Sequence, residues 1–137
     1  MNKLIGDFIQ SNARVLDLGC GDGSLLAFLK KNNQVKGLGL EIDHKKIQEC
    51  LQKDVSVIDQ DIDSGLSNFQ DQSFDAVIMS QSIQALRKPE VALEEITRIG
   101  KEAIISIPNF ANWRCRLQLI FGGTMPISSA LPHDWYS

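Results

Sequence analysis

Short apolar runs alternate along the chain with segments in which apolar residues recur every three or four positions. The runs, each typical of a buried strand, occupy residues 14–19, 36–41, 55–58, 74–79 and 102–107. The periodic segments, each typical of a helix, occupy residues 24–31, 44–53 and 89–100. Strands this apolar are buried on both faces, and consecutive parallel strands need a helical crossover. The pattern therefore predicts an α/β, doubly wound fold with a mostly parallel sheet of about five strands.

Residues with strong positional preferences mark the ends of these elements. Asp43 stands at the N-cap position before the second helix. Pro89 takes the first position of the third helix, Glu90 behind it complements the helix dipole, and Gly100 ends the helix. Pro108 is expected to stop the fifth strand, because proline cannot donate to the ladder.

The C-terminal part of the chain is predicted to form one more helix followed by a loop. Apolar side chains fall on one helical stripe of residues 111–121, namely Trp113, Leu117, Ile120 and Phe121. Gly122 and Gly123 would cap that helix. Residues 124–137 contain Pro126 and Pro132 and are typical of a loop.

Composition narrows the classes of partner. The 137 residues, 43% hydrophobic and 23% charged, predict a single domain over residues 1–137. The net charge of −3 lacks the positive field that nucleic-acid binding needs, so we expect a small-molecule or protein partner. No stretch approaches the roughly 18 apolar residues of a membrane span, and residues 1–10 do not form a secretion signal, so we expect a cytoplasmic protein without membrane contact. Cys20, Cys50 and Cys115 form no disulfide or metal-binding pattern and are expected to be reduced, packed thiols.

The strongest local signal is a glycine-rich turn between the first strand and the first helix, with Asp17, Gly19, Gly21 and Gly23 at alternate positions. In open α/β sheets, ligands bind at the carboxyl ends of the strands, where glycines let a ligand approach the backbone. A dinucleotide site is disfavoured, because its G-x-G-x-x-G motif needs a third glycine where Ser24 stands. A tight turn without a ligand is the remaining alternative.

The spacing D-x-G-x-G-x-G resembles the first motif of class I S-adenosylmethionine-dependent methyltransferases. This resemblance implies S-adenosylmethionine or S-adenosylhomocysteine as the cofactor, bound over Gly19, Cys20, Gly21 and Gly23. The ligand carries an ammonium group, which the carboxylate of Asp17 at the end of the strand can bind directly or through water.

Residues that follow the next strands complete the predicted cofactor site. Glu41 ends the second strand, where a carboxylate accepts hydrogen bonds from both ribose hydroxyls; its alternative is a solvent-exposed charge. Ile42 would contact the adenine face or pack in the core. Asp61 would accept a hydrogen bond from the adenine amine, with the Ile62 backbone amide available to a ring nitrogen, or be a solvated loop acid. Ser80 would line the methyl-donor end or simply close its strand.

No catalytic residue can be assigned from the sequence. Residues 80–84 differ from the Asn-Pro-Pro-aromatic motif of amine-modifying methyltransferases, so an amide-nitrogen or nucleobase acceptor has no support. Methyl transfer depends largely on positioning and does not require a distinctive acid or base. Asp59, Asp61 and Asp63 lack the glycine and glutamate of a calcium loop, and the two histidines lack zinc-ligand spacing, so no metal site is predicted. Arg98 is interpreted as a solvated charge.

Several segments together are more specific than the glycine motif. They are 14–23, 39–43, 74–75, 80–81, 106–110, 113–114, 116–119, 131–132 and 135–136. Over nearly the whole chain these segments resemble the MetW family, which is associated with bacterial methionine biosynthesis. The resemblance implies a Rossmann-like methyltransferase fold that supports a homoserine O-acyltransferase by direct association. The alternative function is a small-molecule methyltransferase, so whether the chain is an enzyme stays open.

Members of that family usually continue past this point into a further helix and two strands, whereas this chain ends at Ser137. We therefore expect a shortened domain with an exposed sheet edge. A partner, including a second copy of the chain in a homodimer, would lie along that edge. The apolar face of the helix predicted at 111–121, with Arg114 and Arg116, is the candidate partner surface.

Overall fold

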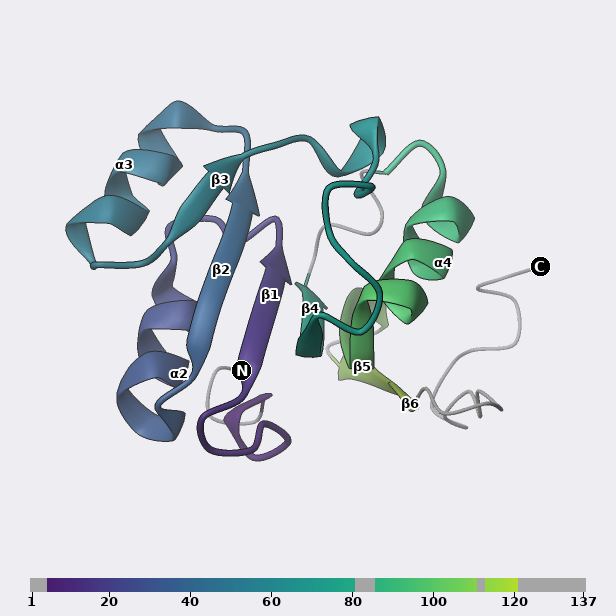
Figure 1. Ribbon diagram of the computed structural model, residues 1–137, viewed down its shortest axis with the longest axis horizontal. Coiled ribbons are helices and arrows are strands. Elements are labelled where there is room, and N and C mark those ends of the chain that lie inside the picture. Colours follow the sequence, from purple (N-terminus) through teal and green to yellow (C-terminus); the bar gives the residue numbers. More distant parts are fainter. Residues whose placement is uncertain (1–4, 81–85, 111–112, 121–137) are drawn as a thin grey trace.

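The computed structural model describes residues 5–80, 86–110 and 113–120, which form a twisted sheet with helices on both faces (Figure 1). The strands are β1 Arg14–Leu18, β2 Lys36–Glu41, β3 Val57–Asp59, β4 Phe74–Ser80, β5 Gly100–Phe110 and β6 Trp113–Ile120. The helices are α2 Ser24–Asn33, α3 His44–Gln52 and α4 Pro89–Ile99, with one 3-10 turn, η1 Ile62–Ser64. The sheet is six-stranded, and its strand order is β3-β2-β1-β4-β5-β6.

Adjacent strands from β3 to β5 run parallel, which confirms the doubly wound α/β prediction. The chain first adds strands outward from β1 to β3 and then returns to the other side of β1 with β4. The order therefore reverses between β1 and β4. In open sheets of this kind, the crevice at the carboxyl ends of those two strands is where ligands bind.

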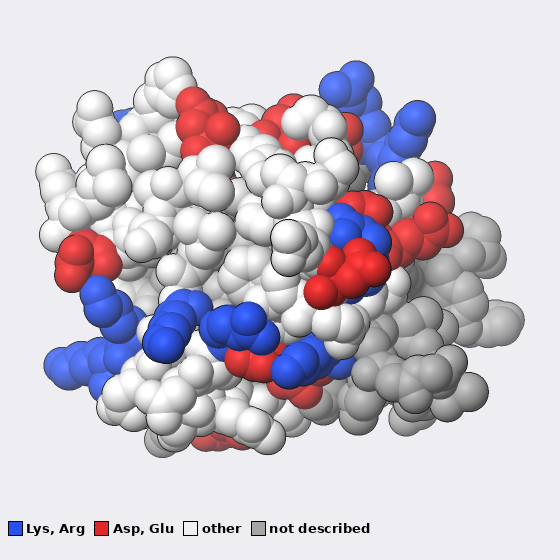
Figure 2. Space-filling view, in the orientation of Figure 1, with Lys and Arg blue, Asp and Glu red and all other residues white. Residues whose placement is uncertain are grey.

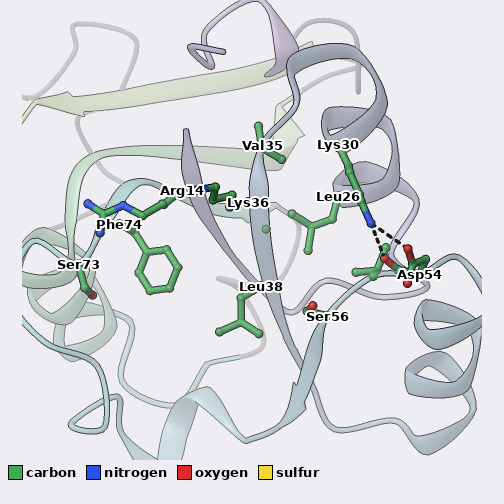
Figure 3. Close-up of a pocket in the computed structure, with 12 residues that line it drawn as sticks. Arg14, Leu26, Lys30, Val35, Lys36, Leu38, Asp54, Ser56, Ser73 and Phe74 are labelled. Carbon is green, nitrogen blue, oxygen red and sulfur yellow. Dashed lines mark hydrogen bonds and ion pairs between the residues drawn. The ribbon is translucent and has the colours of Figure 1, made fainter. Parts of the chain in front are cut away.

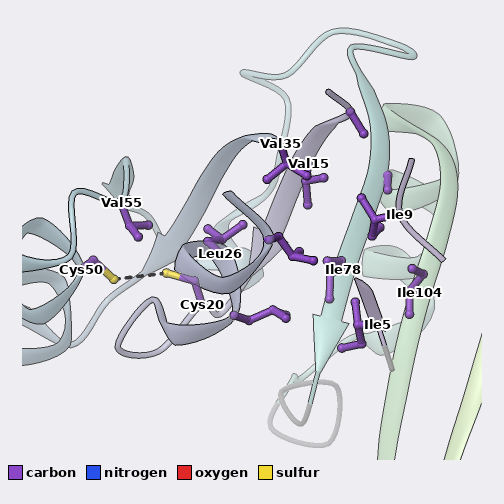
Figure 4. Close-up of a cluster of buried hydrophobic side chains, with 14 residues drawn as sticks. Ile5, Ile9, Val15, Cys20, Leu26, Val35, Cys50, Val55, Ile78 and Ile104 are labelled. Atoms are coloured by element: carbon purple, nitrogen blue, oxygen red, sulfur yellow. Dashed lines mark hydrogen bonds between the residues drawn. The ribbon is translucent and has the colours of Figure 1, made fainter. Parts of the chain in front are cut away.

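Alternate residues of the strands build two apolar layers, one on each face of the sheet. Val15 and Ile78 belong to the layer beneath α2 and α3, together with Leu26 of α2 (Figure 4). Leu16 belongs to the opposite layer, together with Ile96 of α4. Because side chains alternate along a strand, one short buried run supplies both layers.

The prediction of a helix at residues 111–121 is wrong. Residues 113–120 form β6, which pairs antiparallel with β5 from Glu102↔Ile120 to Phe110↔Trp113. The sequence carries a second periodicity that explains the strand, because polar residues alternate with apolar ones at every other position. The polar positions are Arg114, Arg116 and Gln118, and the apolar ones are Trp113, Cys115, Leu117 and Leu119.

The fifth strand also extends further than predicted, because it continues through Pro108 to Phe110. Its register with β6 shifts between Ile107 and Phe110, and a proline is tolerated at such an irregularity, where no ladder bond is required of it. β6 is the outermost strand at this end of the sheet among the described residues. Pairing of a partner along it stays a prediction, and the loop predicted at 124–137 lies outside the described residues.

None of the helices in residues 5–80, 86–110 and 113–120 is long and apolar enough to cross a membrane.

Candidate functional site

The glycine turn joins β1 to α2 at the carboxyl edge of the sheet. Gly21 and Gly23 have φ angles of 60° and 82°, a left-handed conformation that strains any residue with a side chain. A Cβ on Gly21 would meet nothing within 4 Å, so backbone conformation alone accounts for glycine there. A Cβ on Gly23 would lie 3.0 Å from Cys50 Sγ and 3.3 Å from its Cα, so this glycine also permits close packing against α3.

Asp17 lies beneath this turn with a carboxyl group that the described residues leave incompletely satisfied. Its side chain is only 1% exposed, and Oδ1 has no hydrogen-bond partner within residues 5–80, 86–110 and 113–120. Burial, together with the neighbouring Glu41 carboxylate, raises the pKa of Asp17 from its usual 3.8 to about 8. A buried polar atom without a partner is costly, so this position favours a hydrogen-bond donor, above all a positively charged one, from outside the described residues.

Glu41 at the end of β2 faces the same turn. Its Oε1 accepts a hydrogen bond from the backbone N–H of Gly21 at 2.8 Å, and its Oε2 accepts from Ile42 and Asp43 N–H at 3.1 Å each. The Cys20 N–H donates to the Leu40 carbonyl at 2.9 Å and fixes the turn to β2 a second time. A carboxylate has about four acceptor positions, so Glu41 keeps some capacity for a further donor.

Ile42 and Asp61 stand at neighbouring strand ends. The side chain of Ile42 is 57% exposed, which is unusual for an isoleucine and leaves an apolar surface beside the turn. Gln60 N–H donates to the Glu41 carbonyl at 3.3 Å, so Asp61 lies one residue beyond a contact with the end of β2. Asp61 Oδ1 accepts from Asp63 N–H at 3.0 Å and caps η1, a structural role that the sequence did not indicate. Ile62 packs partly against the α4 layer.

Ser80 is the last residue of β4. The register pairs Leu18, the last residue of β1, with Met79 of β4. The backbone of Ser80 therefore lies one residue beyond the pairing of β4 with β1. The side chain of Ser80 and all of Gln81 lie outside the described part of the structure.

Cys50 lies beside the glycine turn, although the sequence predicted it only to be a packed thiol. Its Sγ donates to the Gly21 carbonyl at 3.2 Å and lies 3.7 Å from Cys20 Sγ (Figure 4). Both thiols are free and buried, as predicted. Burial raises the pKa of each thiol, so both stay protonated at neutral pH. Because no short-range motif links positions 20 and 50, this contact could not be predicted from the sequence.

Arg98 is not the solvated charge that was predicted. It is 29% exposed, and its guanidinium donates to the Leu66 carbonyl at 3.0 Å and the Phe69 carbonyl at 2.7 Å. It also forms ion pairs with Asp71 and Glu95 at 2.8 and 2.7 Å. Because it joins α4 to the segment before β4, it holds the long β3–β4 connection in place.

Known proteins resemble this chain in both sequence and structure. A bifunctional methionine biosynthesis protein MetXA/MetW of Rhodopirellula baltica is 33% identical over 140 residues, which cover 96% of this chain and 22% of the relative. The chain thus spans about a fifth of the length of that relative.

Two solved structures carry the same fold. A putative methyltransferase in complex with the Haloferax volcanii Trm112 methyltransferase activator is 28% identical, with a TM-score of 0.66 over 72% of this chain and 46% of that chain. A methyltransferase of Thermotoga maritima, described as dependent on S-adenosylmethionine and as a possible histamine N-methyltransferase, is 25% identical, with a TM-score of 0.64 over 77% and 49%. These similarities confirm the Rossmann-like methyltransferase fold.

The family model described as methionine biosynthesis protein MetW matches residues 2–137. This match spans the glycine turn, both apolar layers and the antiparallel β6. The chain therefore belongs to the MetW family of methionine biosynthesis proteins.

Proposed function

We propose that the glycine turn binds S-adenosylmethionine or S-adenosylhomocysteine, and that the protein in this form supports a homoserine O-acyltransferase. The observation that carries the cofactor assignment is the buried Oδ1 of Asp17, which has no partner among the described residues and lies beneath a left-handed turn. A turn built only to connect a strand and a helix has no need of a buried carboxyl group, whose desolvation is costly. An ammonium group from a ligand would satisfy it.

The other residues of the site match the remaining parts of this ligand. Glu41 has one acceptor position left for a ribose hydroxyl, and the exposed side chain of Ile42 suits one face of the adenine. Asp61 and the backbone of Ile62 would bind the polar edge of the base. Gly19, Cys20, Gly21 and Gly23 would lie beneath the amino-acid end, and Ser80 at the methyl-donor end, as the methyltransferase motif implies.

Electrostatics favour a cationic ligand over a phosphate-bearing one. Asp17 and Glu41 place two carboxyl groups at the turn, and Asp22 adds a third in the loop, with its pKa lowered by hydrogen bonds from Ser24. A pyrophosphate would be repelled by these groups. Burial and the neighbouring Glu41 carboxylate keep Asp17 protonated in the free protein, and a ligand with an ammonium group would favour its ionised form by pairing with it.

The supporting role rests on the relative in which MetXA and MetW form one protein. Joining two modules in one chain raises the effective concentration of each for the other. The MetW resemblance connects this arrangement with homoserine acylation. When bound, S-adenosylmethionine would supply an electrophilic methyl group; no described residue is assigned as an acid or base toward an acceptor.

Two measurements test the two parts of the proposal. Calorimetry with S-adenosylmethionine and S-adenosylhomocysteine should show binding that Glu41→Gln weakens; no binding of either ligand rejects the cofactor assignment. Homoserine O-acyltransferase should co-purify with this chain and lose activity when the chain is omitted. No association and no effect on the acylation rate would reject the supporting role, even if the cofactor binds.

A small-molecule methyltransferase is the second candidate, favoured by the resemblance to S-adenosylmethionine-dependent enzymes. The test is transfer of a labelled methyl group to a panel of small carboxylates and hydroxyl compounds. Turnover of one of these acceptors, lost in Asp17→Asn, would establish this activity in place of the supporting role.

A further inference from the structure

A pocket lies at the opposite end of the sheet from the glycine turn. It has a volume of about 510 Å³ and is lined by residues at the amino ends of the strands (Figure 3). Arg14 begins β1, Lys36 begins β2 and Phe74 begins β4, and the register places Arg14 directly beside Lys36. We call this the amino-end pocket. None of residues 19–23 of the glycine turn lines it.

The charged groups around the amino-end pocket leave an excess of positive charge. Lys30 Nζ pairs with Asp54 at 3.0 Å, whereas Arg14 and Lys101 share the single carboxylate of Asp75, at 3.6 and 3.3 Å. The ammonium of Lys36 has no ion-pair or hydrogen-bond partner in the part of the chain that the structure describes. Among the described residues that line the pocket itself, three are cations, Arg14, Lys30 and Lys36, and one is a carboxylate, Asp54.

This local excess is opposite in sign to the net charge of the chain, which is −3. Lys and Arg side chains form a row across the lower part of the face seen in Figure 2. A positive patch on an acidic protein attracts anions to one place on the surface while the rest repels them.

Between the charged groups, the pocket offers apolar surface. Leu38 of β2 and Phe74 of β4 are half-buried, and Leu26 of α2 lies on the other side of the strand end (Figure 3). Leu26 packs directly on the backbone of Gly37, where a Cβ would meet its Cδ2 at 2.9 Å. The hydroxyl group of Ser56 is exposed at the rim and provides one more polar contact.

We propose that the amino-end pocket binds a small organic anion, a carboxylate carried on an aliphatic or aromatic body. Its volume falls within the range of roughly 300–1,000 Å³ that is usual for small-molecule sites. An inorganic ion would leave the apolar floor in contact with water. A protein partner would need about 800 Å² of contact surface, much more than one pocket of this size supplies.

Nuclear magnetic resonance of the labelled full chain tests this site with 4-phenylbutyrate as the probe. Binding should shift the amide signals of Gly37, Ser56 and Phe74 with a submillimolar Kd and leave those of Gly21 and Gly23 unchanged. The uncharged alcohol 4-phenylbutan-1-ol and inorganic phosphate should each bind at least tenfold more weakly, because each offers only half of the required chemistry.

Lys36→Gln should weaken 4-phenylbutyrate binding about threefold to fivefold, the range expected for one exposed ion pair. Lys45→Gln, at an exposed lysine of α3, is the matched control and should have no effect. Cofactor binding at the turn, measured by calorimetry, should be equal in both variants and confirms that each is folded.

Three results would overturn the proposal. The first is the absence of shifts up to about 10 mM probe, the weak end of measurable affinity. The second is equal binding of the alcohol, which would show that the cations play no part. The third is tighter binding of an acidic, leucine-containing peptide than of 4-phenylbutyrate, which would assign the pocket to a protein segment instead.

Discussion

The carboxylate of Glu41 and the backbone N–H of Gly21, 20 positions apart in the sequence, are joined by a hydrogen bond of 2.8 Å. This bond connects the end of β2 to the turn after β1 without any bound ligand. The residue that is expected to hold the ribose therefore also shapes the turn on which the ligand would rest.

Replacement of Glu41 should thus affect both stability and ligand binding. Glu41→Gln retains the size of the side chain but removes its charge and one acceptor atom. We expect a loss of about 1–2 kcal/mol in the free energy of unfolding and at least a tenfold loss of affinity for S-adenosylhomocysteine. Chemical denaturation and calorimetry measure the two effects. Glu94→Gln, at an exposed position of α4, is the control, and an equal loss there would contradict the prediction.

Asp17 predicts a particular pH dependence. Its pKa is raised from an ordinary 3.8 to about 8 in the folded protein, so the folded state keeps a proton that the unfolded state has released between those values. Stability of the ligand-free protein should therefore fall as the pH rises from 4 to 8, by at most about 1.4 kcal/mol per pH unit from this group. Melting temperatures across this pH range, without ligand, test the sign.

Asp17→Asn should separate stability from binding. The amide cannot ionise, so at pH 8 the variant should be more stable than the original chain, with a flatter pH profile. Its affinity for S-adenosylmethionine should nevertheless fall about tenfold or more, because a neutral amide no longer pairs with the ammonium group. A variant that loses stability and keeps its affinity would show that the carboxylate has a purely structural role.

A comparison of Gly23 with Gly65 separates the effect of close packing at the glycine turn from the effect of backbone strain. Both have positive φ angles, 82° and 104°, but a Cβ would meet Cys50 at Gly23 and nothing within 4 Å at Gly65. Gly65→Ala should cost about 1–3 kcal/mol through backbone strain alone, and Gly23→Ala should cost more. Adding Cys50→Ala to Gly23→Ala should recover part of the difference. Equal losses from both glycine variants, measured by urea denaturation, would exclude a contribution from the contact.

Arg98 should control the order of the segment that precedes β4. Arg98→Lys retains the charge but loses the planar fork that reaches the carbonyls of Leu66 and Phe69 together. We expect a loss of about 1–3 kcal/mol in stability and faster hydrogen exchange at residues 66–72. Arg87→Lys, at an arginine whose side chain is 83% exposed, is the comparison and should change neither quantity.

The elements that the sequence predicted well are those in which local and tertiary preferences agree. Asp43 caps α3 through bonds to Lys45 and Lys46 N–H, and Pro89 begins α4, at the positions that their side chains favour. Residues 113–120 were misread because they satisfy two periodicities at once, and pairing with β5 decides between them. A single apolar stripe could not show that an antiparallel partner was available.

In the candidate site, too, some features follow from local sequence patterns and others depend on tertiary contacts. The positions of Asp17, Gly21 and Glu41 follow from a motif and from the alignment of parallel strand ends, so sequence reasoning located them. The contact of Cys20 with Cys50 and the pairing of Arg98 with the β3–β4 connection depend on how helices lie on the sheet. The two cysteines are 30 positions apart, and Arg98 is 29 positions from Phe69 and 32 from Leu66. No short sequence pattern predicts contacts over such distances.

The close approach at Gly23 and at Gly39 limits how this turn can be redesigned. A Cβ on Gly39 would lie 2.8 Å from Cys20 Cβ, and one on Gly23 would meet the backbone of α3. Libraries intended to broaden ligand scope would lose most members to unfolding if they varied these floor positions. Ile42 is exposed beside the turn, so directed evolution of a new specificity has its best starting point there, whereas Asp61 also caps η1.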